Sequence, residues 1–83
     1  MNDAEEPEVE LVYIAGKLEE AKNVEAVFER HRIDYDVRVE QYRAGFIFAS
    51  VRAGAFFYVP ADEAARSREI LSGLGYRIQE PSL

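Results

Sequence analysis

Hydrophobic and polar positions in the first half of the chain predict a strand, a helix and a second strand. Residues 9–15 (VELVYIA) form a nearly continuous apolar run, which is typical of a strand covered on both faces. Between Gly16 and about Arg32, apolar residues recur at helical spacing, with acids in the first turn and bases in the last, as the helix dipole favours. Residues 35–41 alternate between apolar and charged, which predicts a half-buried strand.

The second half repeats the order of strand, helix and strand. Residues 55–59 (AFFYV) predict another strand that is apolar on both faces, and Pro60 ends it. A helix is expected from about Asp62, with Gly73 as the residue that follows it. Residues 76–79 predict a last short strand.

The segment 42–54 is ambiguous. Its residues 46–48 (FIF) suit either an extra short strand or a loop packed on the sheet. The surrounding stretch 44–61 carries one charge, Arg52, but a membrane-spanning helix needs about 20 apolar residues and a central arginine opposes insertion. We therefore expect short buried strands here and no membrane span.

The predicted order βαββαβ is that of a ferredoxin-like sandwich, an α+β fold. In that fold a four-stranded antiparallel sheet, with strand order 4-1-3-2, carries two helices on one face. The pattern agrees, because the first and third strands are apolar throughout, as central strands are, whereas the second and fourth carry charges that protect sheet edges. We expect a single domain over 9–80, preceded by a disordered acidic tail at 1–8.

Negative charge is concentrated at the start of the chain. The 83 residues carry a net charge of −6, and residues 1–10 hold five acids and no base, which leaves the rest nearly neutral. An acidic chain lacks the basic stripe of a phosphate binder, so nucleic acid is not an expected partner. The chain has no cysteine, which excludes disulfides and thiol catalysis and suits a reducing compartment. With no signal segment at the N-terminus, these features predict a cytoplasmic protein.

The titratable residues form no pattern that specifies a reaction. His31 is the only histidine, and we expect it as a solvated cation at the end of a helix. The acids occur as pairs at 19–20, at 34 and 36, and at 62–63, where a solvated surface explains them better than a glycosidase or hard-metal site. We therefore predict no catalytic residue, no metal and no cofactor.

Two arginines are candidates for an anion site. Arg43 and Arg52 flank the aromatic segment 46–48. The simpler interpretation is that they keep this apolar segment soluble.

Aromatic residues supply the strongest hint of a functional surface. Six of the ten lie between Tyr42 and Tyr58, and two helices can cover only one face of the sheet. If Ile14 and Phe57 point to the helices, their neighbours point away and leave an aromatic face, which commonly marks an interface unless 46–48 folds over it. The candidate partner-binding residues are Tyr13, Phe46, Phe48, Phe56 and Tyr58. A protein partner or a homodimer is expected there, and a small-molecule ligand is the alternative.

Several short motifs resemble a bacterial family of prokaryotic signal-transducing proteins, a domain family of unknown function. The likeness covers about residues 11–72. It includes a first strand, a Glu-Ala pair in the first helix, a turn at the Gly-Ile position of the family, a Val-Pro strand end and an acidic helix that closes in Ile-Leu. These motifs stand here as Tyr13–Ala15, Glu20-Ala21, Arg32-Ile33, Tyr58–Glu63 and Arg68–Leu71. The chain departs from the family at Arg32, where glycine is expected, and at Lys17, where an asparagine-like residue is expected. The resemblance implies a fold similar to nitrogen-regulatory trimers and gives no catalytic residue.

A second, looser likeness is to RNA-recognition motifs, which share βαββαβ and expose aromatics on the central strands. Residues 12–16 resemble their first-strand box, but in 52–59 the glycine and aromatics are out of step. The sequence thus predicts a non-enzymatic binding or regulatory module that acts through its open sheet face. The alternatives are an RNA-binding domain and a small enzyme of unknown reaction.

Overall fold

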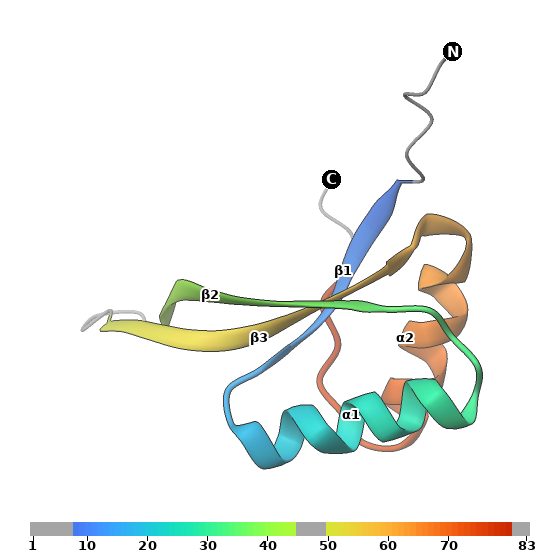
Figure 1. The fold of residues 1–83 in the computed structure, drawn as a ribbon, viewed down its shortest axis with the longest axis horizontal. Helices are drawn as coiled ribbons and strands as arrows, with labels where there is room; N and C mark the ends of the chain where they lie inside the picture. Colours follow the sequence, from blue (N-terminus) through green and yellow to red (C-terminus); the bar gives the residue numbers. More distant parts are fainter. Residues whose placement is uncertain (1–7, 45–49, 81–83) are drawn as a thin grey trace.

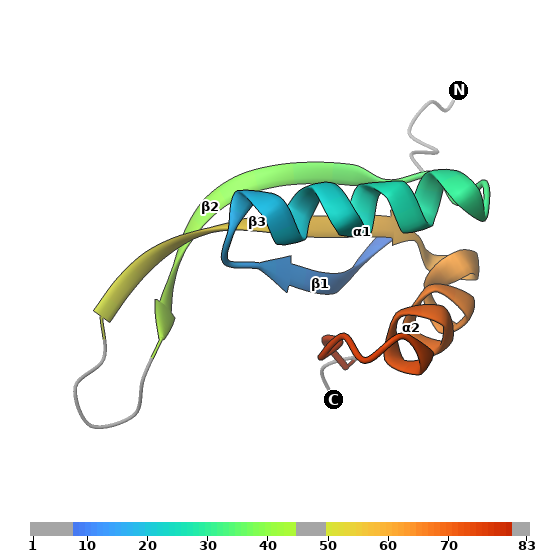
Figure 2. The ribbon, with the colours of Figure 1, turned by 90° about the horizontal axis from the view of Figure 1, so that it is seen from below.

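The computed structural model describes residues 8–44 and 50–80 and places one antiparallel sheet against two helices (Figure 1). Both helices lie on the same side of the sheet, as Figure 2 shows from below. The chain is therefore an α+β fold of two layers, as predicted. Its elements are β1 (Val9–Ala15), α1 (Leu18–Arg30), β2 (Asp36–Ala44), β3 (Ser50–Pro60), the 3₁₀ helix η1 (Ala61–Glu63) and α2 (Ala64–Gly73).

The sheet has three strands in the order β1-β3-β2, so the predicted four-stranded sheet with order 4-1-3-2 is wrong. β3 is central, whereas β1, predicted to be central, is an edge strand. The segment 76–79, predicted as the fourth strand, has no strand structure. Within the described residues it makes one backbone hydrogen bond to β1, from the Gln79 N–H to the Val12 carbonyl at 2.8 Å.

The Arg68 side chain takes the place of the missing backbone ladder. Its guanidinium donates to the Leu11 carbonyl at 3.0 Å and to the Gln79 carbonyl at 2.6 Å, and thus joins α2, β1 and the C-terminal segment. It also lies 3.1 Å from the Glu10 carboxylate, and the Arg68 side chain is only 11% exposed. Because the guanidinium already occupies these carbonyls, the C-terminal segment follows β1 without regular strand pairing.

A bulge in β1 determines which side chains enter the core. Leu11 pairs with Tyr58 and Tyr13 pairs with Phe57, so Val12 is the extra residue between two consecutive positions of β3. Val12 and Tyr13 are both buried, at 0% and 4% exposure, in the core beneath the helices. Strict alternation would have placed one of them on the opposite face.

Phe57 of the central strand occupies the middle of this core. Its ring lies 6.0 Å from Phe28 of α1, 6.1 Å from Tyr35 and 6.4 Å from Tyr13, in tilted or edge-on arrangements that aromatic pairs favour. The other buried hydrophobic residues of this core are Val12, Ala15, Ala21, Val24, Val27, Ile33, Val59, Ala64 and Leu71.

Helix α1 ends in a Schellman cap that uses an arginine where glycine is usual. Arg32 has a φ of 58°, in the left-handed region. The Ile33 N–H donates to the Phe28 carbonyl at 2.9 Å, and the Arg32 N–H donates to the Glu29 carbonyl at 3.2 Å. The left-handed turn that favours glycine is thus present, although the Arg32 side chain makes this conformation sterically unfavourable.

Helix α2 ends in the same cap, with glycine at the expected kind of position. Gly75 has a φ of 94°, and the Tyr76 N–H donates to the Leu71 carbonyl at 3.0 Å. The prediction that Gly73 is the first residue after the helix is therefore wrong, because Gly73 is still helical. The turn sends Tyr76 back toward Tyr13, where the two rings meet edge-on at 5.5 Å.

Strands β2 and β3 form a hairpin that extends beyond α1 (Figure 1). Their pairing continues to Ala44 and Ser50, so much of the ambiguous segment 42–54 belongs to strands. Residues 46–48 and the acidic tail at 1–7 lie outside the described residues. No helix in the described part of the chain is long and apolar enough to cross a membrane.

We expect Arg32→Gly to stabilise the domain by about 1 kcal/mol, because glycine adopts a positive φ without the steric cost borne by arginine. The midpoint of thermal unfolding should rise by roughly 4–8 °C. The control is Arg30→Gly, the same chemical change inside the last helical turn, which should destabilise by about 1 kcal/mol. A loss of stability in Arg32→Gly would contradict this account of the cap.

We expect Arg68→Met to cost about 2–3 kcal/mol in urea unfolding, because two carbonyls lose a charged donor. Arg66 on the same helix provides the control. It is half-exposed and bonds Glu63 and the His31 carbonyl, so Arg66→Met should cost less than about 1 kcal/mol. Equal costs for the two substitutions would show that Arg68 does not have the structural role described.

Candidate interaction surface on the open face of the sheet

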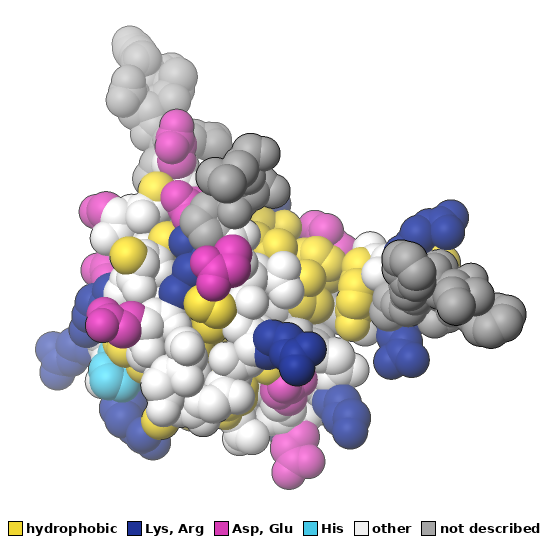
Figure 3. Space-filling view, turned by 180° about the vertical axis from the view of Figure 1, so that it is seen from behind, with side chains coloured by type: hydrophobic (Ala, Val, Ile, Leu, Met, Phe, Trp, Pro, Cys, Tyr) yellow, Lys and Arg dark blue, Asp and Glu magenta, His cyan; other side chains and the backbone are white. Residues whose placement is uncertain are grey.

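The face of the sheet turned away from the helices, here called the open face, is defined by the strand register. Tyr58 of β3 pairs with Leu11 and Asp36, and Phe56 pairs with Ile14 and Arg38. Because side chains alternate along each strand, these rows share one face. The open-face residues are Leu11, Ile14, Asp36, Arg38, Glu40, Tyr42, Arg52, Gly54, Phe56 and Tyr58. Figure 3 shows hydrophobic side chains gathered over the strands where the hairpin leaves the body of the domain.

Tyr42, Phe56 and Ile14 form the apolar centre of this face. The Tyr42 ring packs edge-on against Phe56, with centroids 5.8 Å apart. Gly54 makes this packing possible, because a Cβ there would lie 2.8 Å from the Tyr42 ring and 3.0 Å from the Ile14 side chain. Phe56 is consequently only 9% exposed, although no helix covers it.

An arginine stacks beside this apolar centre. The Arg38 guanidinium lies 4.8 Å from the centre of the Tyr58 ring and bonds the Asp36 carboxylate at 2.9 Å. That hydrogen bond raises the pKa of Arg38. The contacts with Asp36 and Tyr58 together place the positive charge beside the aromatic ring. The open face thus combines aromatic rings with fixed charges of both signs.

The structure separates the five residues predicted to bind a partner. Phe56 and Tyr58 lie on the open face, as expected, whereas Tyr13 lies on the helix side and donates to the Glu20 carboxylate. The expectation that Ile14 and Phe57 share a face is wrong, because the bulge shifts the register. Phe46 and Phe48 lie outside the described residues.

Sequence reasoning overlooked Tyr42 and Gly54 as parts of this surface. Tyr42 was available as an aromatic residue at even spacing from Arg38 in an alternating strand. Gly54 gave no signal, because its role depends on the ring that crosses it from the neighbouring strand.

The two arginines of the predicted anion site do not converge. Arg52 pairs with Tyr42 on the open face, while Arg43 pairs with Val51 on the helix side. These are consecutive cross-strand pairs, and the side chains of consecutive pairs point to opposite faces of the sheet. The backbone register therefore gives no support to a shared anion site.

One member of each acidic pair has a local partner. Glu20 bonds Tyr13, Asp36 bonds Arg38, and Glu63 pairs with Arg66 at 3.2 Å. Among residues 8–44 and 50–80, no group of three or more histidine or acidic side chains is placed to hold a metal ion.

The phenols of Tyr13, which is buried, and Tyr35, which is half-buried, remain protonated far into the alkaline range. Burial raises the pKa of Tyr13, and its hydrogen bond to Glu20 adds to the effect. Burial and the hydrogen bond to Glu29 raise the pKa of Tyr35 to about 12. Neither phenol is thus tuned to act as a general base at neutral pH.

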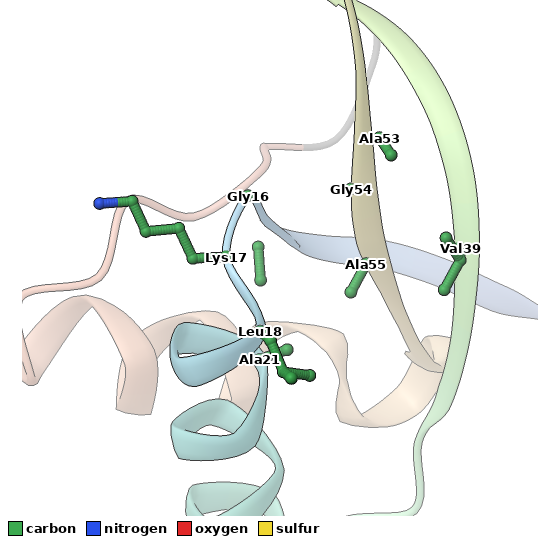
Figure 4. Close-up of a pocket in the computed structure, with 9 residues that line it drawn as sticks. Gly16, Lys17, Leu18, Ala21, Val39, Ala53, Gly54 and Ala55 are labelled. Carbon is green, nitrogen blue, oxygen red and sulfur yellow. The ribbon is translucent and has the colours of Figure 1, made fainter.

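A shallow apolar groove of about 180 Å³ lies on the helix side, between the start of α1 and the hairpin (Figure 4). Leu18 and Val39 are large hydrophobic residues at this groove and are 74% and 78% exposed. The Lys17 side chain extends away from it in Figure 4. The groove lining consists of Ala15, Gly16, Lys17, Leu18, Ala21, Val39, Ala53, Gly54 and Ala55.

We expect Gly54→Ala to destabilise the domain by about 1–3 kcal/mol, because the new methyl group must displace the Tyr42 ring or Ile14. In a Tyr42→Ala background the same change should cost less, and a double-mutant cycle from urea unfolding measures the difference. Gly73→Ala is the control, since nothing lies within 4 Å of a Cβ there. A neutral Gly54→Ala would contradict the described packing.

Similarity to known proteins gives no assignment for this surface. Comparisons with protein-family models, with curated proteins and with solved structures give no match. The resemblance to signal-transducing proteins therefore remains a prediction from short motifs. The functional argument depends on the residues of this chain and on the open face that they form.

Proposed function

We propose that this chain is a non-enzymatic binding module that contacts a protein partner through the open face of its sheet. The observation that carries the proposal is the packed cluster of Tyr42, Phe56 and Ile14 beside the Arg38–Tyr58 stack. Aromatic residues and arginine are the types enriched at the centres of protein interfaces.

The arrangement of the open face supports a preorganised contact. Gly54 fixes the Tyr42 ring against Phe56, so few side-chain rotamers need to be ordered when a partner docks. Asp36 and Glu40 add negative charge next to Arg38, which gives a mixed polar rim. A rim of this kind favours a partner with complementary charges rather than a purely apolar one.

The signalling role implied by the family resemblance is compatible with such a module, acting in the cytoplasm. For the RNA-binding alternative, Tyr13 is not available to stack on a base, because its ring is 4% exposed and lies in the core.

A photo-crosslinking amino acid at position 58 tests the proposal in the native cell. We expect it to capture one specific protein, and we expect Arg38→Glu, which places a negative charge beside that position, to reduce the yield at least about tenfold. The same crosslinker at Leu74 is the control, because Leu74 is 57% exposed at the end of α2, away from the sheet. Identical products from positions 58 and 74 would contradict the proposal.

A further inference from the structure

The two edges of the sheet differ in how they are covered. At β1, the Arg68 guanidinium and the Gln79 N–H occupy the Leu11 and Val12 carbonyls. At β2, pairing within the described residues involves only β3, so the outer backbone groups of β2 face outward. An edge of this kind is a template for another strand.

The charge order along β2 is complementary to itself. Asp36, Arg38 and Glu40 share the open face, and Val39 lies between the last two on the helix side. In an antiparallel pair centred on Val39, Arg38 of one copy stands opposite Glu40 of the other, twice. We propose that a second copy of this chain pairs with β2 in this register.

Registers centred on the charged residues of β2 are disfavoured by charge. When two copies of β2 pair about a two-fold axis, residues that stand opposite each other must point to the same face of the joined sheet. Because side chains alternate along the strand, this requires the axis to pass through a residue and not between two residues. Centring on Arg38 sets two arginines opposite each other, and centring on Glu40 sets two glutamates opposite each other. A register centred on Val37 sets Asp36 opposite Arg38, but it pairs only three residues of each copy, 36–38. The register centred on Val39 pairs seven, 36–42.

The helix side of β2 supports the same register. Val39 is 78% exposed, and Leu18 across the groove is 74% exposed. Pairing through Val39 places the valines of the two copies in contact and covers apolar surface beside the groove. Glu40 makes no ion pair within the described part of the chain, so its carboxylate is available to the other copy.

This pairing goes beyond the proposed function and does not depend on it. It joins two three-stranded sheets into one of six strands, with both open faces on the same side. The two contacts share Arg38 and Glu40, whereas Val39 lies on the helix side and belongs to the β2 edge alone, so the Val39→Cys cross-link and partner capture at position 58 are separate results.

Single cysteine variants test the register, because the chain has no cysteine of its own. Val39→Cys should form an intermolecular disulfide on mild oxidation, since its Cα lies about 4.5–5.5 Å from its counterpart in this register. The control Val37→Cys should not, because its counterpart lies about 13 Å away. Equal cross-linking of the two variants, or none in Val39→Cys, would overturn the register.

Charge reversal tests the contact itself by sedimentation velocity over about 1 µM to 1 mM. Glu40→Lys alone and Arg38→Glu alone each set like charges opposite one another, so each should weaken self-association at least about tenfold. A mixture of the two variants should form a heterodimer, since both contacts then become attractive. Glu69→Lys, the same charge change at an exposed position of α2, is the control and should self-associate like the wild-type chain. A monomeric wild-type chain, or a mixture that does not associate, would overturn the proposal.

Discussion

The hydrogen bonds of Arg68 hold together the parts of this domain that backbone pairing leaves separate. A three-stranded sheet with two helices on one side has an edge at β1 that would otherwise expose its carbonyls. The guanidinium of Arg68 reaches that edge from α2 and also fixes the last described segment at Gln79. Because the side chain is 11% exposed, these bonds form where water competes poorly. The sequence distance between Arg68 and Leu11 is 57 residues, so one side chain connects both ends of the domain.

Sequence patterns predicted the order and kind of the first five elements because each follows from local periodicity. They failed where a tertiary contact decides the outcome. Residues 76–79 have the composition of a strand, but the guanidinium of Arg68 occupies the carbonyl that a ladder would use. Tyr13 was assigned to the wrong face because strict alternation cannot show a bulge at Val12. Part of the open face was predictable from Phe56 and Tyr58, whereas Gly54 acquires its role only when Tyr42 crosses it.

The central strand links stability and surface chemistry. Phe57 occupies the core beneath the helices, while its neighbours Phe56 and Tyr58 build the open face. Substitutions in β3 therefore affect the core on one side and the proposed binding surface on the other. β2 contributes to the open face as well, through Arg38 and Tyr42, and also carries the free edge. The two proposed contacts thus meet at Arg38 and Glu40 of one hairpin.

The hairpin of β2 and β3 extends past the helix layer, and this has a consequence for its motions. Its inner rungs rest on α1, whereas Val51 near the outer end is 61% exposed and Arg43 opposite it is also exposed. The outer residue pairs are held mainly by the hydrogen bonds between β2 and β3, so these bonds break by local fraying. The inner pairs also pack on the helices, so their bonds break only when the whole domain unfolds. Amide exchange should therefore be fast near Arg43 and slow near Val37. The outer rungs near Arg43 and Val51 can therefore open without loss of the folded core.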